Sequence, residues 1–281
     1  MPLVNIEDDF DLEKIADSGQ VFRAREVSPG VFRFITLDHT IDMQKISEGE
    51  YKISCSSAEW DIVWSKYFDI DTNYAEIRKQ IVEFGENKPF GEYLRKATEF
   101  SKGIRILRQE PFETLISFII SQRKNIPSIK KIVEELCEAY GNDLVAGDGS
   151  TIKAFPKVDD LCKRSAFELS RFSLGYRSAY IHDALQRVKG LAVALDDLYS
   201  SNDEDLMNVL KTIKGVGDKI AACVGLYAYH RFACVPIDVW IKKAIKEDFK
   251  GENVFVQFGS LAGVLQQYIF YYKRFGLREL I

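Results

Sequence analysis

The chain of 281 residues is 46% apolar and 12% aromatic, which is enough to build a packed core in one large or two ordinary domains. Its formal net charge of −4 excludes a uniformly basic nucleic-acid coat, so any DNA or RNA site must be a local patch on an acidic body. No apolar run approaches the ~18 residues of a membrane helix, and the acidic start MPLVNIEDDF lacks a signal-peptide pattern, so we expect an intracellular protein.

The first part of the chain predicts antiparallel strands. Three short alternating segments are separated by the turn sequences SPG, LDH and SEGE. These segments are VFRFITL (31–37), IDMQKISEG (41–49) and EYKISCS (50–56). A helix, AEWDIVWSKYF (58–68), follows them. We expect residues 1–95 to form an antiparallel β-rich domain with helices.

From residue 72 onward the patterns are helical. TNYAEIRKQIVEFG (72–85) begins with a cap at Thr72, and EPFETLISFIISQ (110–122) is apolar nearly all round, which predicts a central buried helix. Further helices are expected at 128–141, 158–163, 165–171, 177–189, 194–200, 203–211 and 261–276. The predicted fold class is α+β, with residues 96–281 forming a larger all-helical domain.

A helical hairpin is predicted at about residues 203–230. Its sequence LMNVLKTIKGVGDKIAA (206–222) places a tight glycine turn between two helices whose apolar residues face each other. The second helix begins near Asp218, and its unpaired N–H groups point into the turn, which suits a phosphate. A glycine-rich turn between two core helices is the alternative.

Lys219 and Asp238 can face the same cleft, since both lie at helix starts and are nineteen residues apart. A free lysine amine has a pKa near ~10.4, so it attacks as a nucleophile only in a partly desolvated, positively biased place such as a helix N-terminus. A carboxylate opposite it would stabilise positive charge that develops on a substrate. Two alternatives remain open at this point: a helix cap for Asp238, and an ordinary surface pair for both residues.

The five cysteines form no CxxC pair and are odd in number, which favours a reduced compartment. They are Cys55, Cys137, Cys162, Cys223 and Cys234. Neither a zinc site nor an iron–sulfur cluster is predicted.

The chain resembles the 8-oxoguanine DNA glycosylases, a family of the helix-hairpin-helix DNA glycosylase superfamily. The hairpin matches the superfamily pattern L-x-x-I-x-G-V-G-x-K-x-A, and VPIDVW (235–240) resembles its glycine-proline-aspartate region, with Val235 in place of the glycine. Four further stretches are similar to the narrower family: FDLEKIADSGQVFR (10–23), LRQEPFETLISFIISQ (107–122), LGYRSAYI (174–181) and AGVLQQYIF (262–270). The resemblance therefore spans nearly the whole chain.

The resemblance implies a bifunctional glycosylase and abasic-site lyase. Such an enzyme flips the damaged nucleotide out of the duplex at a cost of a few kcal/mol. Lys219 would attack the sugar, displace the base and form a Schiff base, and β-elimination would then nick the strand. Asp238 would stabilise the oxocarbenium-like sugar and help to deprotonate the lysine.

The resemblance also implies a pocket for the flipped base. The Gly19 carbonyl would accept the N7 hydrogen that 8-oxoguanine has and guanine lacks. Gln266 would hold the Watson–Crick edge, and Phe270 and Cys223 would stack on the two faces. Without the resemblance, Gly19 is a turn glycine and both stacking residues are core residues. Because Gln267 adjoins Gln266, a slip of one residue stays open.

The expected DNA contacts are Gly215, Val216, Gly217, Ile220, Trp240, Tyr176, Arg177 and Arg123. The hairpin amides would hold a phosphate, Tyr176 would act as a wedge and Arg177 would face the opposite strand. The alternative is a helix-start aromatic for Tyr176, a surface arginine for Arg177 and helix packing for Trp240.

Two positions depart from the family. Asparagine is usual at the position of Arg123 and arginine at that of Ser128, and both usual residues contact the cytosine opposite the lesion. We therefore predict a weaker preference for cytosine, with Arg123 filling the vacated stack.

Three hypotheses follow: an 8-oxoguanine glycosylase, a glycosylase for another damaged purine, and a non-catalytic helix-hairpin-helix DNA-binding protein. Lys219 with Asp238 argues against the third, and Gly19, Cys223, Gln266 and Phe270 argue against the second. We expect a monomer acting on double-stranded DNA containing oxidised guanine, in the cytoplasm, nucleoid or nucleus and not at a membrane. No cofactor or metal site is expected, although a cation can bridge the hairpin and a DNA phosphate.

Overall fold

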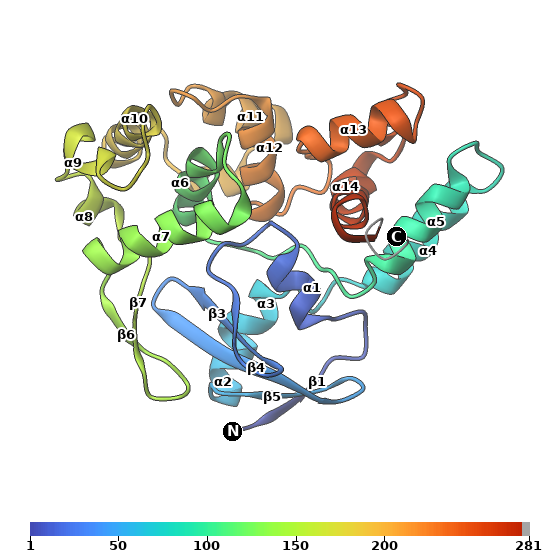
Figure 1. The fold of residues 1–281 in the computed structure, drawn as a ribbon, viewed down its shortest axis with the longest axis horizontal. Helices are drawn as coiled ribbons and strands as arrows, with labels where there is room; N and C mark the ends of the chain where they lie inside the picture. The colour runs from blue at the N-terminus through green and yellow to red at the C-terminus, as the bar shows by residue number, and fades with distance from the viewer. Residues whose placement is uncertain (277–281) are drawn as a thin grey trace.

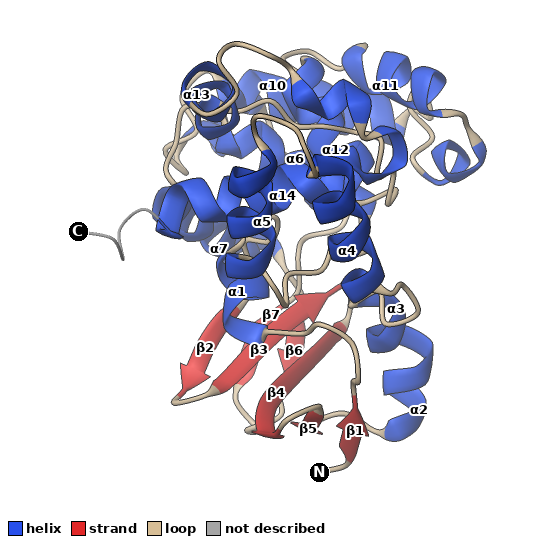
Figure 2. Ribbon diagram, turned by 90° about the vertical axis from the view of Figure 1, so that its right-hand side faces the viewer, coloured by secondary structure: helices blue, strands red, loops and turns tan. Residues whose placement is uncertain are grey.

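An antiparallel sheet of five strands forms one end of the molecule, and most of the helices lie beyond it (Figures 1 and 2). The computed structural model describes residues 1–276. The strands lie in the order β1-β5-β4-β3-β2, so the segments from β2 to β5 form a meander of hairpins. Their bounds are β1 (Leu3–Asn5), β2 (Arg25–Ser28), β3 (Val31–Thr36), β4 (His39–Ser47) and β5 (Glu50–Ile53). The alternation predicted β3 to β5, whereas β1 and β2 were not predicted.

Helices dominate the remainder, and the α+β fold class is confirmed. Their bounds are α1 (Leu12–Asp17), α2 (Ser57–Glu59), α3 (Ser65–Tyr67), α4 (Tyr74–Gly85), α5 (Gly91–Phe100), α6 (Pro111–Ser121), α7 (Ile126–Tyr140), α8 (Val158–Leu161), α9 (Ala166–Ser170), α10 (Arg177–Lys189), α11 (Asp203–Lys211), α12 (Asp218–Tyr227), α13 (Val239–Glu247) and α14 (Ala262–Tyr271). A π-helical turn over Trp60–Trp64 joins α2 to α3, and another, Tyr272–Gly276, follows α14. Short 3-10 turns cover Asp196–Ser200, Val254–Gln257 and Gly259–Leu261.

Two hydrophobic cores divide the molecule. One lies between the sheet and helices α1 and α3, and it contains Ile15, Phe34 and Trp64. The other contains the apolar faces of α4 and α5 together with those of α6, α12 and α14. Helix α4 therefore packs with the helices that follow it, although the predicted boundary at residue 95 groups it with the sheet.

The cap of α4 differs from the prediction. Its N-cap is Asn73 and not Thr72, because the Asn73 side chain accepts a hydrogen bond from the amide of Glu76 at 2.8 Å. Asp8 adds a carboxylate at this helix start and accepts from the amides of Tyr74 and Ala75. An anionic group there complements the positive end of the helix dipole.

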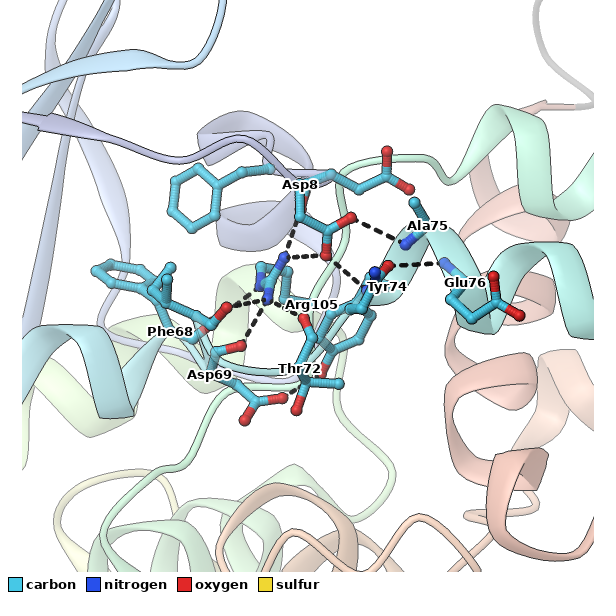
Figure 3. Close-up of polar contacts among 12 residues, drawn as sticks. Asp8, Phe68, Asp69, Thr72, Tyr74, Ala75, Glu76 and Arg105 are labelled. Carbon is cyan, nitrogen blue, oxygen red and sulfur yellow. Dashed lines mark hydrogen bonds and ion pairs between the residues drawn. The ribbon is translucent and has the colours of Figure 1, made fainter.

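Arg105 ties the two cores together. Its side chain is fully buried, and its guanidinium donates to the Phe68 carbonyl at 3.0 Å and to the Asp8 carboxylate at 2.9 Å (Figure 3). The same group donates to the carbonyls of Asp69 and Thr72, both at 2.6 Å. One side chain thus joins the segment before α1, the end of the sheet domain and the start of α4.

A two-stranded hairpin, β6 (Asp143–Val145) and β7 (Thr151–Lys153), interrupts the helical part and was not predicted. It extends from the end of α7 to the five-stranded sheet, as Figure 1 shows. Asp148 at its tip pairs with Arg33 of β3 at 3.0 Å. Each strand of this hairpin has only three residues, too few to show an alternating pattern in the sequence. The hairpin depends instead on its contact with a distant strand.

Candidate active site

Helices α11 and α12 form the predicted hairpin, with a glycine turn between them. Ile213, Val216 and Ile220 are buried, so the two helices share a packed interior. Gly215 has a φ of +82°, and a Cβ at this position would overlap the ring of Tyr180 on α10. Glycine is therefore required at Gly215 for both conformation and space.

The start of α12 offers unpaired amides to solvent. Gly217 is the N-cap residue, it is exposed, and no side chain caps it. Among the described residues, the backbone amides of Gly217, Asp218 and Lys219 donate no hydrogen bond to another group of the protein. The Val216 amide, in contrast, donates to the Ile213 carbonyl at 3.0 Å. An anion can therefore bind at Gly217 and the first turn of α12.

A pocket of about 290 Å³ lies beside this helix start and brings together the residues predicted for catalysis and base recognition. Lys219 lies in the first turn of α12, with its Nζ 5.2 Å from the ring centroid of Phe118. Asp238 enters the pocket as the N-cap of α13, where its Oδ1 accepts from the Ile241 amide at 2.9 Å. The residues that line the pocket include Gly19, Lys219, Cys223, Asp238, Trp240, Gln266 and Phe270.

Burial shapes the electrostatics of the pocket. Desolvation raises the pKa of Asp238 above the ordinary value of an aspartate, although the Ile241 amide and the Lys219 charge act in the opposite direction. Desolvation also raises the pKa of the Cys223 thiol to about 11, against the opposing effect of Lys219. The Cys223 thiol is therefore neutral near pH 7 and presents an apolar, polarisable surface to the pocket.

Two adjacent glutamines on α14 have different surroundings. Gln266 is 2% exposed, lines the pocket, and its Oε1 has no hydrogen-bond partner among the described residues. Gln267 accepts from the Tyr227 hydroxyl at 2.5 Å and donates to the Ser18 carbonyl at 2.6 Å. Since a buried polar atom without a partner is costly, the Gln266 amide is available for a ligand, whereas Gln267 is engaged in the fold.

Gly19 is held in place by its neighbours in the sequence. Gln20 is fully buried and donates to the Ser18 hydroxyl and the Arg105 carbonyl, while its Oε1 accepts from the Leu107 amide. Gly19 itself has a φ of +79°, and a Cβ there would lie 3.1 Å from the ring of Phe270. The sequence SGQ therefore holds the turn at Gly19, with its backbone carbonyl, against the Phe270 ring in the pocket.

Comparisons with known proteins identify the family. A model of the 8-oxoguanine DNA glycosylase N-terminal domain matches residues 3–115. An N-glycosylase/DNA lyase of Saccharomyces cerevisiae is 36% identical over 160 residues, which cover 53% of this chain and 43% of the yeast protein. The N-glycosylase/DNA lyase OGG1 of Arabidopsis thaliana is 28% identical over 235 residues, which cover 79% of this chain and 62% of the plant protein. The chain thus spans less than two thirds of the length of each of these relatives.

A solved structure matches over its whole length. The 8-oxoguanine glycosylase/lyase of Clostridium acetobutylicum, in complex with double-stranded DNA containing cytosine opposite 8-oxoguanine, is 33% identical with a TM-score of 0.88. The match covers 100% of this chain and 99% of that chain. The chain belongs to the 8-oxoguanine DNA glycosylase family.

Some of the DNA contacts expected from the family lie on the surface, and others do not. Tyr176 is 47% exposed at the start of α10, and Arg123 is exposed just after α6. Val216 and Ile220 are 5% exposed each, so their side chains belong to the interior of the hairpin. Trp240 is partly exposed at the rim of the pocket.

Arg177 is buried, which excludes the alternative of a surface arginine. It is 7% exposed, and its Nε donates to the Gln122 carbonyl at 2.8 Å while its Nη1 donates to the Leu174 carbonyl at 3.1 Å. A second nitrogen of the guanidinium also donates to Gln122. Its observed contacts hold the end of α6, next to Arg123, against the start of α10.

The sequence did not single out the apolar wall of the pocket. Phe22 and Phe118 line the wall with their rings 5.4 Å apart, and Tyr227 stacks on Phe118 at 5.5 Å. Phe22 lies three residues after Gly19, and Phe118 lies on the helix predicted to be buried all round, so neither differs in sequence from an ordinary core residue.

In residues 1–276, no cluster of three or more histidine, cysteine, aspartate or glutamate side chains could hold a metal ion. Within the same residues, no helix is long and apolar enough to cross a membrane.

Proposed function

We propose that this protein excises 8-oxoguanine from duplex DNA and then nicks the strand at the resulting abasic site. One observation carries the proposal: Lys219, Asp238 and the unpartnered Gln266 amide oxygen line a single pocket beside a helix start that can bind phosphate. The relatives support the assignment, because the Clostridium protein is an 8-oxoguanine glycosylase/lyase and the yeast protein is an N-glycosylase/DNA lyase.

The proposed reaction begins with the lysine amine. Unprotonated Lys219 Nζ attacks the sugar C1′ while the bond from C1′ to N9 of the base breaks, and the base leaves with the bonding electrons. Asp238 lies in the same pocket and stabilises the positive charge that develops on the sugar. Loss of a proton from the attached nitrogen and opening of the sugar ring give a Schiff base, whose C2′ proton is then removed as the C3′–O3′ bond breaks.

Recognition in this proposal uses hydrogen bonds and stacking. The Gly19 carbonyl accepts the N7 hydrogen of 8-oxoguanine, and guanine would present a lone pair to this oxygen. An unmatched buried acceptor costs ~1–3 kcal/mol, which contributes to selectivity. Gln266 bonds the Watson–Crick edge, and Cys223 and Phe270 stack on the two faces of the base.

The partner in this proposal is double-stranded DNA, bound through a phosphate at Gly217 and the first turn of α12. The protein acts as a monomer wherever DNA is found, in the cytoplasm, nucleoid or nucleus. The reaction requires no cofactor, because an amine, a carboxylate and water carry every step. A cation that bridges the hairpin carbonyls and the phosphate is a further part of the proposal.

Borohydride trapping tests the proposal, because it reduces the Schiff base to a stable covalent adduct. With an 8-oxoguanine duplex, the wild-type protein should give an adduct that is lost in Lys219→Gln. Lys242→Gln is the matched control, since Lys242 is an exposed lysine of the neighbouring helix α13, and it should retain the adduct.

Duplexes that carry other damaged purines separate the alternatives. An adduct on another lesion and none on 8-oxoguanine would assign the enzyme to a different substrate. DNA binding without an adduct on any lesion would indicate a non-catalytic DNA-binding protein.

A further inference from the structure

Asp183 of α10 bonds the backbone of the hairpin turn. Its Oδ2 accepts a hydrogen bond from the Lys214 amide at 2.8 Å and another from Arg187 Nε at 2.9 Å. Arg187 lies one turn further along α10 and donates to the same carboxylate oxygen as the Lys214 amide. The Asp183 side chain is 29% exposed, and its contact with Arg187 is partly shielded from water, whereas its contact with the Lys214 amide is exposed.

Tyr180 lies under the same turn. Its ring occupies the space that a Cβ on Gly215 would need, and it makes an edge contact with Tyr176 at a centroid distance of 5.5 Å. Residues 176, 180 and 183 are spaced by four and three, so they lie along one face of the helix. One helix face therefore connects the exposed Tyr176 to the turn that precedes α12.

We propose that Asp183 and Tyr180 are positioning residues that hold the phosphate-binding turn at a fixed distance from Tyr176. The inference rests on the proposed function, in which Gly217 and the first turn of α12, directly after this turn, bind a DNA phosphate. Asp183 holds the turn by the Lys214 amide, and Tyr180 supports it from below. Neither residue needs to touch DNA for this role.

Substitutions of Asp183 can separate this positioning role from a charge effect, because the two predict opposite changes in DNA affinity. Asp183 carries a negative charge next to a site that binds an anion, so removing that charge alone should tighten DNA binding. Removing the hydrogen-bond acceptor should instead loosen the turn and weaken binding. Asp183→Ala removes both, whereas Asp183→Asn removes the charge and keeps an oxygen that can accept from the Lys214 amide.

The experiment measures the dissociation constant of short duplexes, with and without 8-oxoguanine, at fixed salt in a Lys219→Gln background that blocks turnover. We expect Asp183→Ala to raise the dissociation constant about tenfold on both duplexes, and Asp183→Asn to bind as tightly as the parent or more tightly. Asp159→Ala is the matched control, because Asp159 pairs with Lys189 at the far end of α10, and it should not weaken binding. Thermal unfolding of every variant verifies that each remains folded.

A second result tests the connection to Tyr176. In the active protein, Tyr176→Ala and Asp183→Ala should each slow single-turnover excision. The double variant should be slowed by a smaller factor than the product of the two separate factors. If Asp183→Ala and Asp183→Asn change the dissociation constant by the same factor, Asp183 acts through its charge and the positioning role is wrong. Absence of 8-oxoguanine excision by the wild-type protein would refute the proposed function, while binding to the undamaged duplex would still decide the positioning role.

Discussion

At the scale of single residues, Asp238 has two roles with opposing requirements. As the N-cap of α13 it accepts from the Ile241 amide, a role that asparagine fills equally well. As a buried carboxylate beside Lys219 it carries a charge that desolvation disfavours, which is why its pKa is raised. The negative charge therefore costs folding free energy that a simple cap would not, and the proposed chemistry gives the reason for its presence.

Asp238→Asn should separate the two roles. We expect turnover of 8-oxoguanine to fall by about 10²-fold or more, since a preorganised charge at the reacting sugar is lost, while DNA binding is retained. The measurement is single-turnover excision together with the dissociation constant. Unchanged turnover would remove Asp238 from the mechanism.

The stability of the same variant should depend on pH in a defined direction. Because the folded-state pKa of Asp238 is raised, its contribution to wild-type stability is greatest below the unfolded value of about 3.9 and is lost as pH rises through the folded value. Asp238→Asn should therefore be at least as stable as the wild type at pH 7, with an advantage that shrinks toward pH 4. Denaturant unfolding at both pH values measures this difference, and a constant difference would contradict its electrostatic origin.

Arg123 combines an exposed position with a left-handed backbone, at a φ of +52°. Asparagine, the usual residue of the family here, tolerates this conformation better than arginine does. Arg123→Asn should raise the free energy of unfolding by about 1 kcal/mol. It should also increase the preference for cytosine opposite the lesion.

Excision assays with 8-oxoguanine opposite each of the four bases test the second expectation. Lys124→Asn serves as the control, because it introduces the same side chain at the next position, which is not left-handed. A strong preference for cytosine in the wild-type protein would refute the predicted weak discrimination.

At the scale of elements, local sequence predicted the structure wherever the deciding interactions were local. The glycine turn between α11 and α12 follows from GVG, and the periodicities of α6, α7 and α10 located these helices to within a few residues. Helix α5 was missed, because it begins at a glycine, Gly91, and no side chain caps its start. The β6–β7 hairpin was missed because Asp148 depends on Arg33, more than a hundred residues away.

The same distinction applies to the site. Lys219 and Asp238 were candidates because helix starts concentrate amides and carboxylates, a local property. Gln267 is engaged because it bonds Tyr227 and Ser18, which come from other elements, so the sequence alone could not tell it from Gln266. The burial of Arg177 depends on the Gln122 carbonyl in the same way, so sequence alone could not distinguish it from a surface arginine.

At the scale of the whole molecule, the pocket that contains Lys219 lies across the boundary between the two cores. Gly19 comes from the turn after α1, which belongs to the sheet domain, whereas Lys219, Asp238 and Gln266 come from helices beyond it. The connection between the domains therefore sets the width of the pocket. Arg105 makes that connection, and its carbonyl also bonds Gln20, the neighbour of Gly19.

Arg105→Met should weaken this connection much more than a comparable change at the surface. Removal of the buried guanidinium leaves the Asp8 carboxylate and several carbonyls without their donor, which should cost about 3–5 kcal/mol of unfolding free energy. Arg108→Met is the matched control, because the Arg108 side chain is 47% exposed and the Asp69 carboxylate that it bonds keeps the Tyr74 hydroxyl as a donor, so this variant should cost less than Arg105→Met.

The two cores also offer separate signals for this experiment. Trp60 and Trp64 lie in the core of the sheet domain, so their fluorescence in a Trp240→Phe background reports on that domain, while far-ultraviolet circular dichroism reports mainly on the helices. We expect the two denaturant transitions to coincide in the parent and in Arg108→Met. In Arg105→Met the fluorescence transition should come first, because the smaller core then unfolds without the support of the larger one. Coincident transitions with an unchanged midpoint would show that the two cores are held together by other contacts.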